Sequence, residues 1–246
     1  MYLGDTDFEI TKREVIVSVI FLLIMLIVGY QIAGYVRHRQ DDRNAKYYQS
    51  IQVSDSTKFN YALKTNAGNT LAYGTVSAVG SVTQEGIGDY MTIDRHYEEY
   101  RMHTRLVCTG SGKTRSCHTQ VYWTWDHIRT DYFGVSQVDF LGHRFLYSEF
   151  PKLPRPTHVG MHKISGHKRY VYYARPLSYT GTMYAYLDDR SLKGDKEFRD
   201  NLRLEDSVNE FVSKYDVPIF WIIFIVILLI IIAVFMYADN DWLNGC

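Results

Sequence analysis

Histidines gather in one stretch of this chain, and they are the side chains best suited to hold a metal ion. Eight of the nine histidines fall between His96 and His167. Neutral imidazole is a common zinc ligand, and the spacing of His158, His162 and His167 is compatible with a metal site as an alternative interpretation. The plainer interpretation is a set of surface histidines in a loop, because glycines interrupt the run and no His-Glu-x-x-His motif occurs. A membrane-anchored, metal-dependent enzyme that uses these three histidines is the alternative function.

Two further patterns have residue types that do chemistry. The run Gly110-Ser-Gly-Lys-Thr114 is similar to the end of a phosphate-binding loop, but the glycine required five residues before the second glycine is replaced by Val107. Glu98 and Glu99 have the carboxylates needed for acid–base work. Adjacent residues of a strand point to opposite faces, so these two carboxylates do not act on one substrate. The sequence therefore predicts a protein without catalytic residues and without a cofactor.

These residues lie in a β-hairpin that the sequence predicts over residues 97–126. Gly110 and Gly112 are turn residues that tolerate positive φ, and Cys108 is placed to form a disulfide with Cys117. Counting outward from the cysteines gives one register, in which Leu106 faces Thr119, Thr104 faces Val121, Met102 faces Trp123, and Tyr100 faces Trp125. A shift by one residue would bury the charged side chains. The register thus separates a mostly apolar face from a polar one.

Aromatic and apolar side chains of this hairpin are the candidates for an interaction surface. The chain has 21 tyrosines, and tyrosine and tryptophan combine a large contact area with a polar group. The interaction candidates are Tyr100, Met102, Tyr122, Trp123 and Trp125. The apolar face that contains Met102, Trp123 and Trp125 also has a simpler interpretation as part of a core. Tryptophan and tyrosine are, however, frequent anchors of protein interfaces.

Two segments are long and apolar enough to cross a bilayer. Residues 15–36 and 217–237 contain no charged side chain, and a span needs about 20 residues. They leave short tails at residues 1–14 and 238–246. The sequence therefore predicts an integral membrane protein with two transmembrane helices.

The segment between the spans has strand-like patterning followed by helical spacing. Residues 37–194 are expected to form a β-rich, mostly antiparallel domain with a short helix at residues 55–64, capped by Ser54 or Asp55. Residues 170–174 and 182–187 are expected to form a second hairpin. From Asp195 apolar residues recur at helical spacing, which predicts an amphipathic juxtamembrane helix over residues 195–216. The fold class is thus a membrane-anchored α+β protein with juxtamembrane helices.

The orientation in the membrane depends on two opposed signals. Arginines and a lysine follow the first span, which by the positive-inside rule places the middle domain in the cytoplasm. Two cysteines at a hairpin pairing position favour an oxidising compartment instead, and long loops cross the membrane largely regardless of charge. We expect the middle domain outside the cytoplasm and both termini inside. Cys246, at the chain end, is a third thiol.

Composition limits the partners. Lys+Arg and Asp+Glu both number 27, so the chain has no general attraction to nucleic acid. The expected partners are the lipid bilayer and either another protein or further copies of the chain. The predicted function is a non-enzymatic membrane protein whose disulfide-closed β-domain mediates protein interaction or assembly at the membrane surface.

A resemblance adds to this interpretation. The runs YGTVSAVGSVTQEGIGDYMTIDRHYEEYRMHT and YWTWDHIRTDYFGVSQVDFLG resemble the beside-the-membrane domain of the GIDE family, which also has two flanking membrane helices. No RING-type cysteine set follows the second span, so the resemblance does not extend to ubiquitin-ligase activity. The tip GSGKTRSCH is similar to two-span membrane proteins of phages and prophages. That resemblance implies a phage or viral membrane protein, with exclusion as one role.

Overall fold

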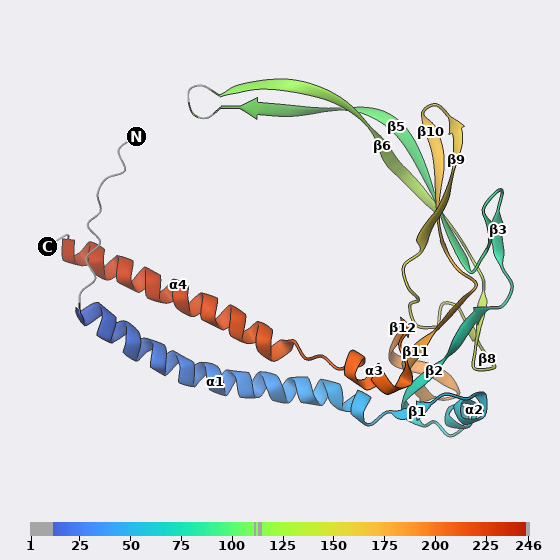
Figure 1. Cartoon of the computed structure of the whole chain (residues 1–246), viewed down its shortest axis with the longest axis horizontal. Helices are drawn as coiled ribbons and strands as arrows, with labels where there is room; N and C mark the ends of the chain where they lie inside the picture. Colours follow the sequence, from blue (N-terminus) through green and yellow to red (C-terminus); the bar gives the residue numbers. More distant parts are fainter. Residues whose placement is uncertain (1–11, 111, 113–114, 245–246) are drawn as a thin grey trace. The chain divides into compact units, whose positions relative to one another are not determined.

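The computed structural model describes residues 12–110, 112 and 115–244, and it divides into two compact units (Figure 1). One unit holds the described residues up to Gln49 together with those from Val208 onward, and the other is Ser50–Ser207. The expected α+β class is confirmed, since two long apolar helices flank an antiparallel β-rich region. The β-rich unit begins only at Ser50, because the first helix continues beyond the predicted span.

The helical unit is built from α1 (Lys12–Tyr48) and α4 (Asp216–Asn244). Both are long and apolar enough to cross a bilayer. In the most apolar segment of each helix, only 6% of the segment is buried. This exposure is what a candidate membrane span has, whereas a core helix of a soluble protein would bury its side chains. The two helices pack closely at Gly29, where an added Cβ would lie 2.7 Å from the ring of Phe224. A small residue at a helix contact lets the backbones approach.

The polar end of α1 holds the segment that leads into α4. The amide of Asn44 donates to the carbonyl of Ser213 over 2.9 Å and accepts from its N–H over 3.1 Å. Gln40 donates to the same carbonyl, and Arg43 forms an ion pair with Asp216. Asn44 is buried, so these bonds compensate the desolvation of its amide. These contacts therefore hold the C-terminal part of α1 against the segment at which α4 begins.

The β-rich unit contains two main sheets and one small hairpin. A six-stranded sheet has the order β12-β11-β2-β7-β8, with β1 parallel to β2, and a four-stranded sheet has the order β6-β5-β10-β9. The strands of the larger sheet are β1 (Ile51–Val53), β2 (Gly68–Ala78), β7 (Gln137–Phe140), β8 (His143–Leu146), β11 (Ser178–Asp188) and β12 (Ser191–Asp200). The others are β3 (Val82–Gln84) and β4 (Gly88–Tyr90), which pair together, and β5 (Thr92–Thr109), β6 (Ser116–Gly134), β9 (Thr157–Ser165) and β10 (Lys168–Arg175).

The main core of this unit combines side chains of the larger sheet with the short helix α2 (Ser56–Lys64). Phe59 of α2 is fully buried and meets the ring of Phe140 edge-on at 5.5 Å. The predicted helix at residues 55–64 is confirmed, and its cap is Asp55, whose carboxylate accepts from the Lys58 N–H at 2.8 Å. Such a cap satisfies one of the free N–H groups of the first turn.

The predicted helix over residues 195–216 is wrong in its first part. Residues up to Asp200 belong to β12, which pairs antiparallel with β11, and helix α3 covers only Leu204–Phe211. Asp189 and Arg190 connect the two strands, and both have positive φ, as a type I′ turn requires. An arginine at the second turn position is not a recognisable turn signal, so the hairpin was not evident from the sequence.

The predicted hairpin of residues 170–174 and 182–187 is also wrong. These strands are β10 and β11, and they belong to different sheets: β10 pairs with β5 and β9, whereas β11 pairs with β2 and β12. Pro176 lies between them and has no N–H to donate to a ladder. The chain therefore passes from one sheet to the other at this point.

Candidate functional site

The outer part of the β5–β6 hairpin extends beyond the rest of its sheet as a two-stranded ribbon (Figure 1). Strand β10 pairs with β5 only as far as Glu99, and the last contact is the Tyr100 N–H, which donates to the carbonyl of His167 over 2.9 Å. Beyond it, residues 101–109 and 116–124 have only each other as ladder partners among the described residues. We call these two segments the ribbon arm. An isolated two-stranded ribbon is marginally stable in water.

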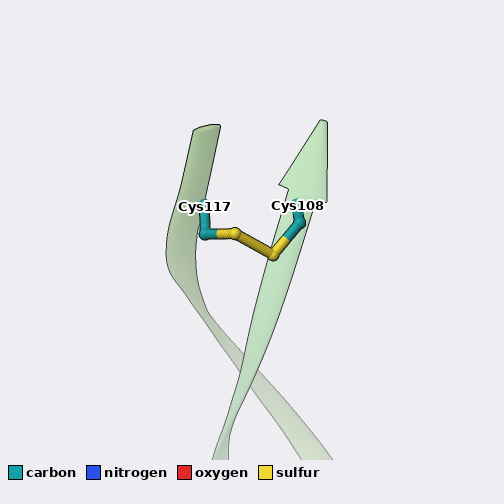
Figure 2. The surroundings of a disulfide bond; sticks show 2 residues. All are labelled: Cys108 and Cys117. Carbon is teal, nitrogen blue, oxygen red and sulfur yellow. A yellow bond between two sulfur atoms is a disulfide. The ribbon is translucent and has the colours of Figure 1, made fainter. Parts of the chain in front are cut away.

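A disulfide closes the ribbon arm near its tip (Figure 2). Cys108 lies directly opposite Cys117, with a Cα–Cα distance of 4.0 Å, as the sequence predicts. Gly110 and Gly112 of the tip have positive φ, also as predicted, whereas Lys113 and Thr114 lie outside the described residues. The cysteines are nine residues apart. If a disulfide acts by lowering the entropy of the unfolded chain, closing a loop of this length adds about 2–3 kcal/mol to the free energy of unfolding. The disulfide thus stabilises a ribbon that has no third strand to support it.

The ribbon arm has an apolar face that is exposed. The predicted register is confirmed from Tyr100 opposite Trp125 to Cys108 opposite Cys117. Met102, Leu106 and Trp123 on this face are 57%, 68% and 50% exposed. The interpretation of this face as core is therefore wrong for Met102 and Trp123. The sequence did not reveal this, because alternation identifies a face and not what covers it.

The base of the arm is held by aromatic and charged contacts. Tyr100 stacks on Trp123 with ring centroids 5.4 Å apart and lies 5.2 Å from the ring of Trp125. The guanidinium of Arg169, from β10, lies 4.1 Å above the Trp125 ring and donates to Glu98 over 2.7 Å. Such a cation–π contact beside a partly buried ion pair stabilises the base of the arm. Arg169 and Glu98 were missed as structural anchors, since they are 71 residues apart in the chain.

The opposite face of the arm is basic and polar. Arg101 donates to Glu99 over 2.6 Å, and Arg105 donates to the neutral amide oxygen of Gln120 over 2.8 Å. The hydrogen bond from Arg101 holds the pKa of Glu99 below its ordinary value, with a further contribution from the Tyr97 hydroxyl. Tyr122, an interaction candidate, lies on this face under the Arg105 guanidinium. The five candidates are thus divided between both faces, with only Tyr122 on the basic one.

The three histidines predicted to bind a metal do not come together. In β9, His162 pairs with Tyr170, whereas His158 pairs with Tyr173, and a bulge between these two positions places the histidines on opposite faces. His167 lies in the β9–β10 turn, 6.2 Å from the Tyr100 ring. Within the described ranges, no three His, Cys, Asp or Glu side chains form a metal-binding group. The expected loop is wrong for His158 and His162, since a strand with a bulge occupies this segment. Metal binding by the three histidines stays a prediction, and their separation does not favour it.

The two adjacent glutamates point apart, as predicted. Glu98 binds Arg169, while Glu99 binds Arg101 and accepts from the hydroxyl of Tyr97. Each carboxylate is therefore part of a different face of the sheet.

Comparison with known proteins does not extend these observations. No family model matches the chain, and no curated protein and no solved structure matches it. The resemblances to the GIDE beside-the-membrane domain and to phage-encoded membrane proteins remain predictions.

Proposed function

We propose that this chain is a non-enzymatic membrane protein whose β-rich unit binds another protein, or further copies of itself, through the ribbon arm. The observation that carries the proposal is the ribbon arm itself, a disulfide-closed two-stranded extension with Met102, Leu106 and Trp123 at least half exposed. Water-exposed apolar side chains in such a contiguous row are typical of a surface that a partner covers. Tryptophan, tyrosine and arginine, which the arm and its base combine, are the commonest anchors of protein interfaces.

The disulfide supports one side of the membrane for the β-rich unit. The Cys108–Cys117 bond persists in an oxidising compartment, which supports an extracytoplasmic β-rich unit with both termini in the cytoplasm. Arginines after the first span oppose this orientation, but a long translocated domain follows the charge rule weakly.

The non-enzymatic part of the proposal draws support from the separation of the groups that could do chemistry. His158 and His162 lie on opposite faces of β9, and Glu98 and Glu99 lie on opposite faces of β5. A role at a phage or viral membrane, including exclusion, is one version of the proposal and follows from the resemblance of the tip.

Photo-crosslinking tests the proposal. A benzoylphenylalanine at Leu106, on the exposed apolar face, is expected to give covalent adducts in cells that make the protein. The same residue at Leu146 of β8, which is 46% exposed but lies in the other sheet, serves as the matched control and should give none. An adduct at twice 28.7 kDa would indicate assembly, and another mass would indicate a different protein.

A second substitution makes the outcome specific to the apolar face. Trp123→Ser in the Leu106 crosslinking variant removes the neighbouring ring and should abolish the adduct. Equal adducts from both positions, or none from Leu106, would contradict the proposal.

A further inference from the structure

The β5 edge of the ribbon arm has no pairing strand, although the same edge is paired with β10 closer to the base of the arm. Strand β5 pairs with β10 up to Glu99, and the described part of the chain supplies no partner for this edge from Arg101 to Cys108. These eight residues span about 26 Å at the rise of a β-strand. The open edge thus has room for one further short strand beyond the β9–β10 turn.

The register determines which backbone groups face outward along this edge. In an antiparallel pair, residues of the closely spaced positions are not hydrogen-bonded to each other, and their N–H and C=O groups point away from the partner strand. The 4.0 Å Cα–Cα distance places Cys108 and Cys117 at such a position. No register shift occurs between Glu98 and Thr109, so Tyr100, Met102, Thr104 and Leu106 have the same orientation. The N–H of Tyr100 confirms it, since it donates outward to His167.

The outward-facing residues are also the residues of the apolar face. Side chains alternate along a strand, so Met102, Thr104 and Leu106 lie on one face, and Arg101 and Arg105 lie on the other. A strand added to this edge would extend both faces at once. Its alternate side chains would lie beside apolar groups on one face and beside guanidinium groups on the other.

The charges of the ribbon arm indicate which side chains an added strand would have on the face beside the arginines. Between Glu99 and Asp126 the chain has four Lys or Arg and no Asp or Glu, although the whole chain is neutral. Arg101 is already paired with Glu99, whereas Arg105 donates to a neutral amide oxygen. A carboxylate of the added strand would therefore form its ion pair with Arg105. The β6 residues opposite Arg101, His103 and Arg105 are Thr124, Tyr122 and Gln120, which makes the β5 edge the more basic of the two.

A flat bilayer fits these features less well. The apolar and basic faces point in opposite directions, so a membrane surface contacts only one of them. Hydrocarbon also cannot satisfy the outward N–H and C=O groups of the edge. Addition of a strand satisfies them and converts the two-stranded ribbon into a three-stranded sheet.

We propose that the open β5 edge, Arg101–Cys108, binds an extended acidic strand of the partner, in which carboxylate side chains alternate with apolar ones. This inference rests on the proposed function and specifies the chemistry of the partner. Main-chain hydrogen bonds to Met102, Thr104 and Leu106 hold the strand. Arg105, together with Arg101, which is already paired with Glu99, attracts its carboxylates.

Synthetic peptides test this proposal on the full-length protein in phosphatidylcholine nanodiscs. The probe is a short fluorescent peptide in which Glu alternates with Val and Thr. Its matched controls are a peptide of identical composition with the glutamates in one block, and a peptide with Lys in place of Glu. The alternating acidic peptide should bind at least about tenfold more tightly than either control, as measured by fluorescence anisotropy.

Protein variants assign the binding to the β5 edge. Arg101→Glu combined with Arg105→Glu should weaken binding at least about tenfold, whereas Lys152→Glu with Arg155→Glu, at exposed positions outside the arm, should leave it unchanged. N-methylation of the peptide amides that face the edge should abolish binding, because it removes main-chain donors while keeping the charge.

Three results would overturn the proposal. Equal affinity for the block peptide would mean attraction by charge alone, and no binding of the alternating peptide would exclude an acidic strand. Binding of phosphatidylglycerol vesicles that depends on Arg101 and Arg105 and displaces the peptide would make a lipid surface the occupant. A Leu106 adduct that persists while the peptides fail would leave the proposed function standing, whereas loss of both would remove both.

Discussion

At the scale of single residues, arginines placed over aromatic rings organise the four-stranded sheet. The Arg95 guanidinium lies 4.6 Å above the ring of Tyr170 and 5.2 Å from that of Phe133, and it donates to Asp131 over 2.9 Å. Arg129 lies above Tyr97 in the same way. The abundant tyrosines thus serve a sheet whose faces are only partly covered, where a ring supports a charged group that keeps contact with water.

Asp131 provides a pH-dependent test of this arrangement. The hydrogen bond from Arg95 and the charge of Arg129 hold the pKa of Asp131 below its ordinary value. A lowered folded-state pKa stabilises the protein above the unfolded value of about 4, and this contribution is lost as the pH falls through the folded value. Asp131→Asn should therefore lower the thermal midpoint at neutral pH, and its difference from the parent should shrink in acid below about pH 4.

Thermal denaturation followed by circular dichroism across this pH range measures the effect. Asp89→Asn, at an exposed carboxylate of β4, is the control and should behave like the parent. A destabilisation by Asp131→Asn that stays constant down to the most acidic pH would show that the lost contact is not electrostatic.

At the scale of elements, the parts of the fold that were predictable are those encoded locally. The β5–β6 register follows from one turn, two cysteines and an uninterrupted alternation, and the structure reproduces it from Tyr100 to Cys108. Helices α1 and α4 follow from composition alone. The α2 cap also has a local signal, Asp55 before a helical pattern.

The parts that were not predictable depend on distant partners. Strand β12 turns back on β11 through Asp189 and Arg190, whose positive φ is not signalled by glycine or asparagine. A bulge in β9 separates His158 from His162, and a bulge is set by the pairing with β10. The exposure of Met102 and Trp123 depends on where β10 ends, at the level of Glu99, which no pattern within the hairpin indicates.

The contact between α1 and α4 can be tested at two glycines of the same helix. A Cβ at Gly29 would approach the Phe224 ring to 2.7 Å, whereas a Cβ at Gly34 would meet nothing within 4 Å. Gly29→Leu should therefore force the helices apart and destabilise the helical unit by about 1–3 kcal/mol, as overpacking does. Gly34→Leu introduces the same side chain without this clash and should have little effect.

Heating in detergent, followed by size-exclusion chromatography of the protein that stays folded, compares the two variants. Equal loss from both substitutions would attribute the effect to the new leucine and not to the helix contact. Restoration by Phe224→Ala in the Gly29→Leu background would confirm that the two side chains compete for one space.

At the scale of the whole molecule, the β-rich unit is an insertion between the two helices. The chain leaves the helical unit after Gln49 and returns to it at Val208. Asn44 and Ser213, on either side of the insertion, are joined by two hydrogen bonds, so both ends of the insertion start from one fixed point. Ends that lie close together are typical of a domain inserted into another part of a chain.

The compartment of this insertion decides which partners reach the ribbon arm, and thiol labelling determines it. In a Cys246→Ser variant only Cys108 and Cys117 remain, and their disulfide blocks both. On intact cells, a membrane-impermeant maleimide should label this variant only after an impermeant reductant, since the bond persists outside the cytoplasm. The parent chain supplies the control: Cys246 should be labelled without reductant, but only after permeabilisation.

Labelling of the variant that needs permeabilisation and no reductant would instead place free thiols in the cytoplasm. The arginines after the first span would then set the orientation, and the acidic strand that we propose for the β5 edge would have to come from a cytoplasmic protein.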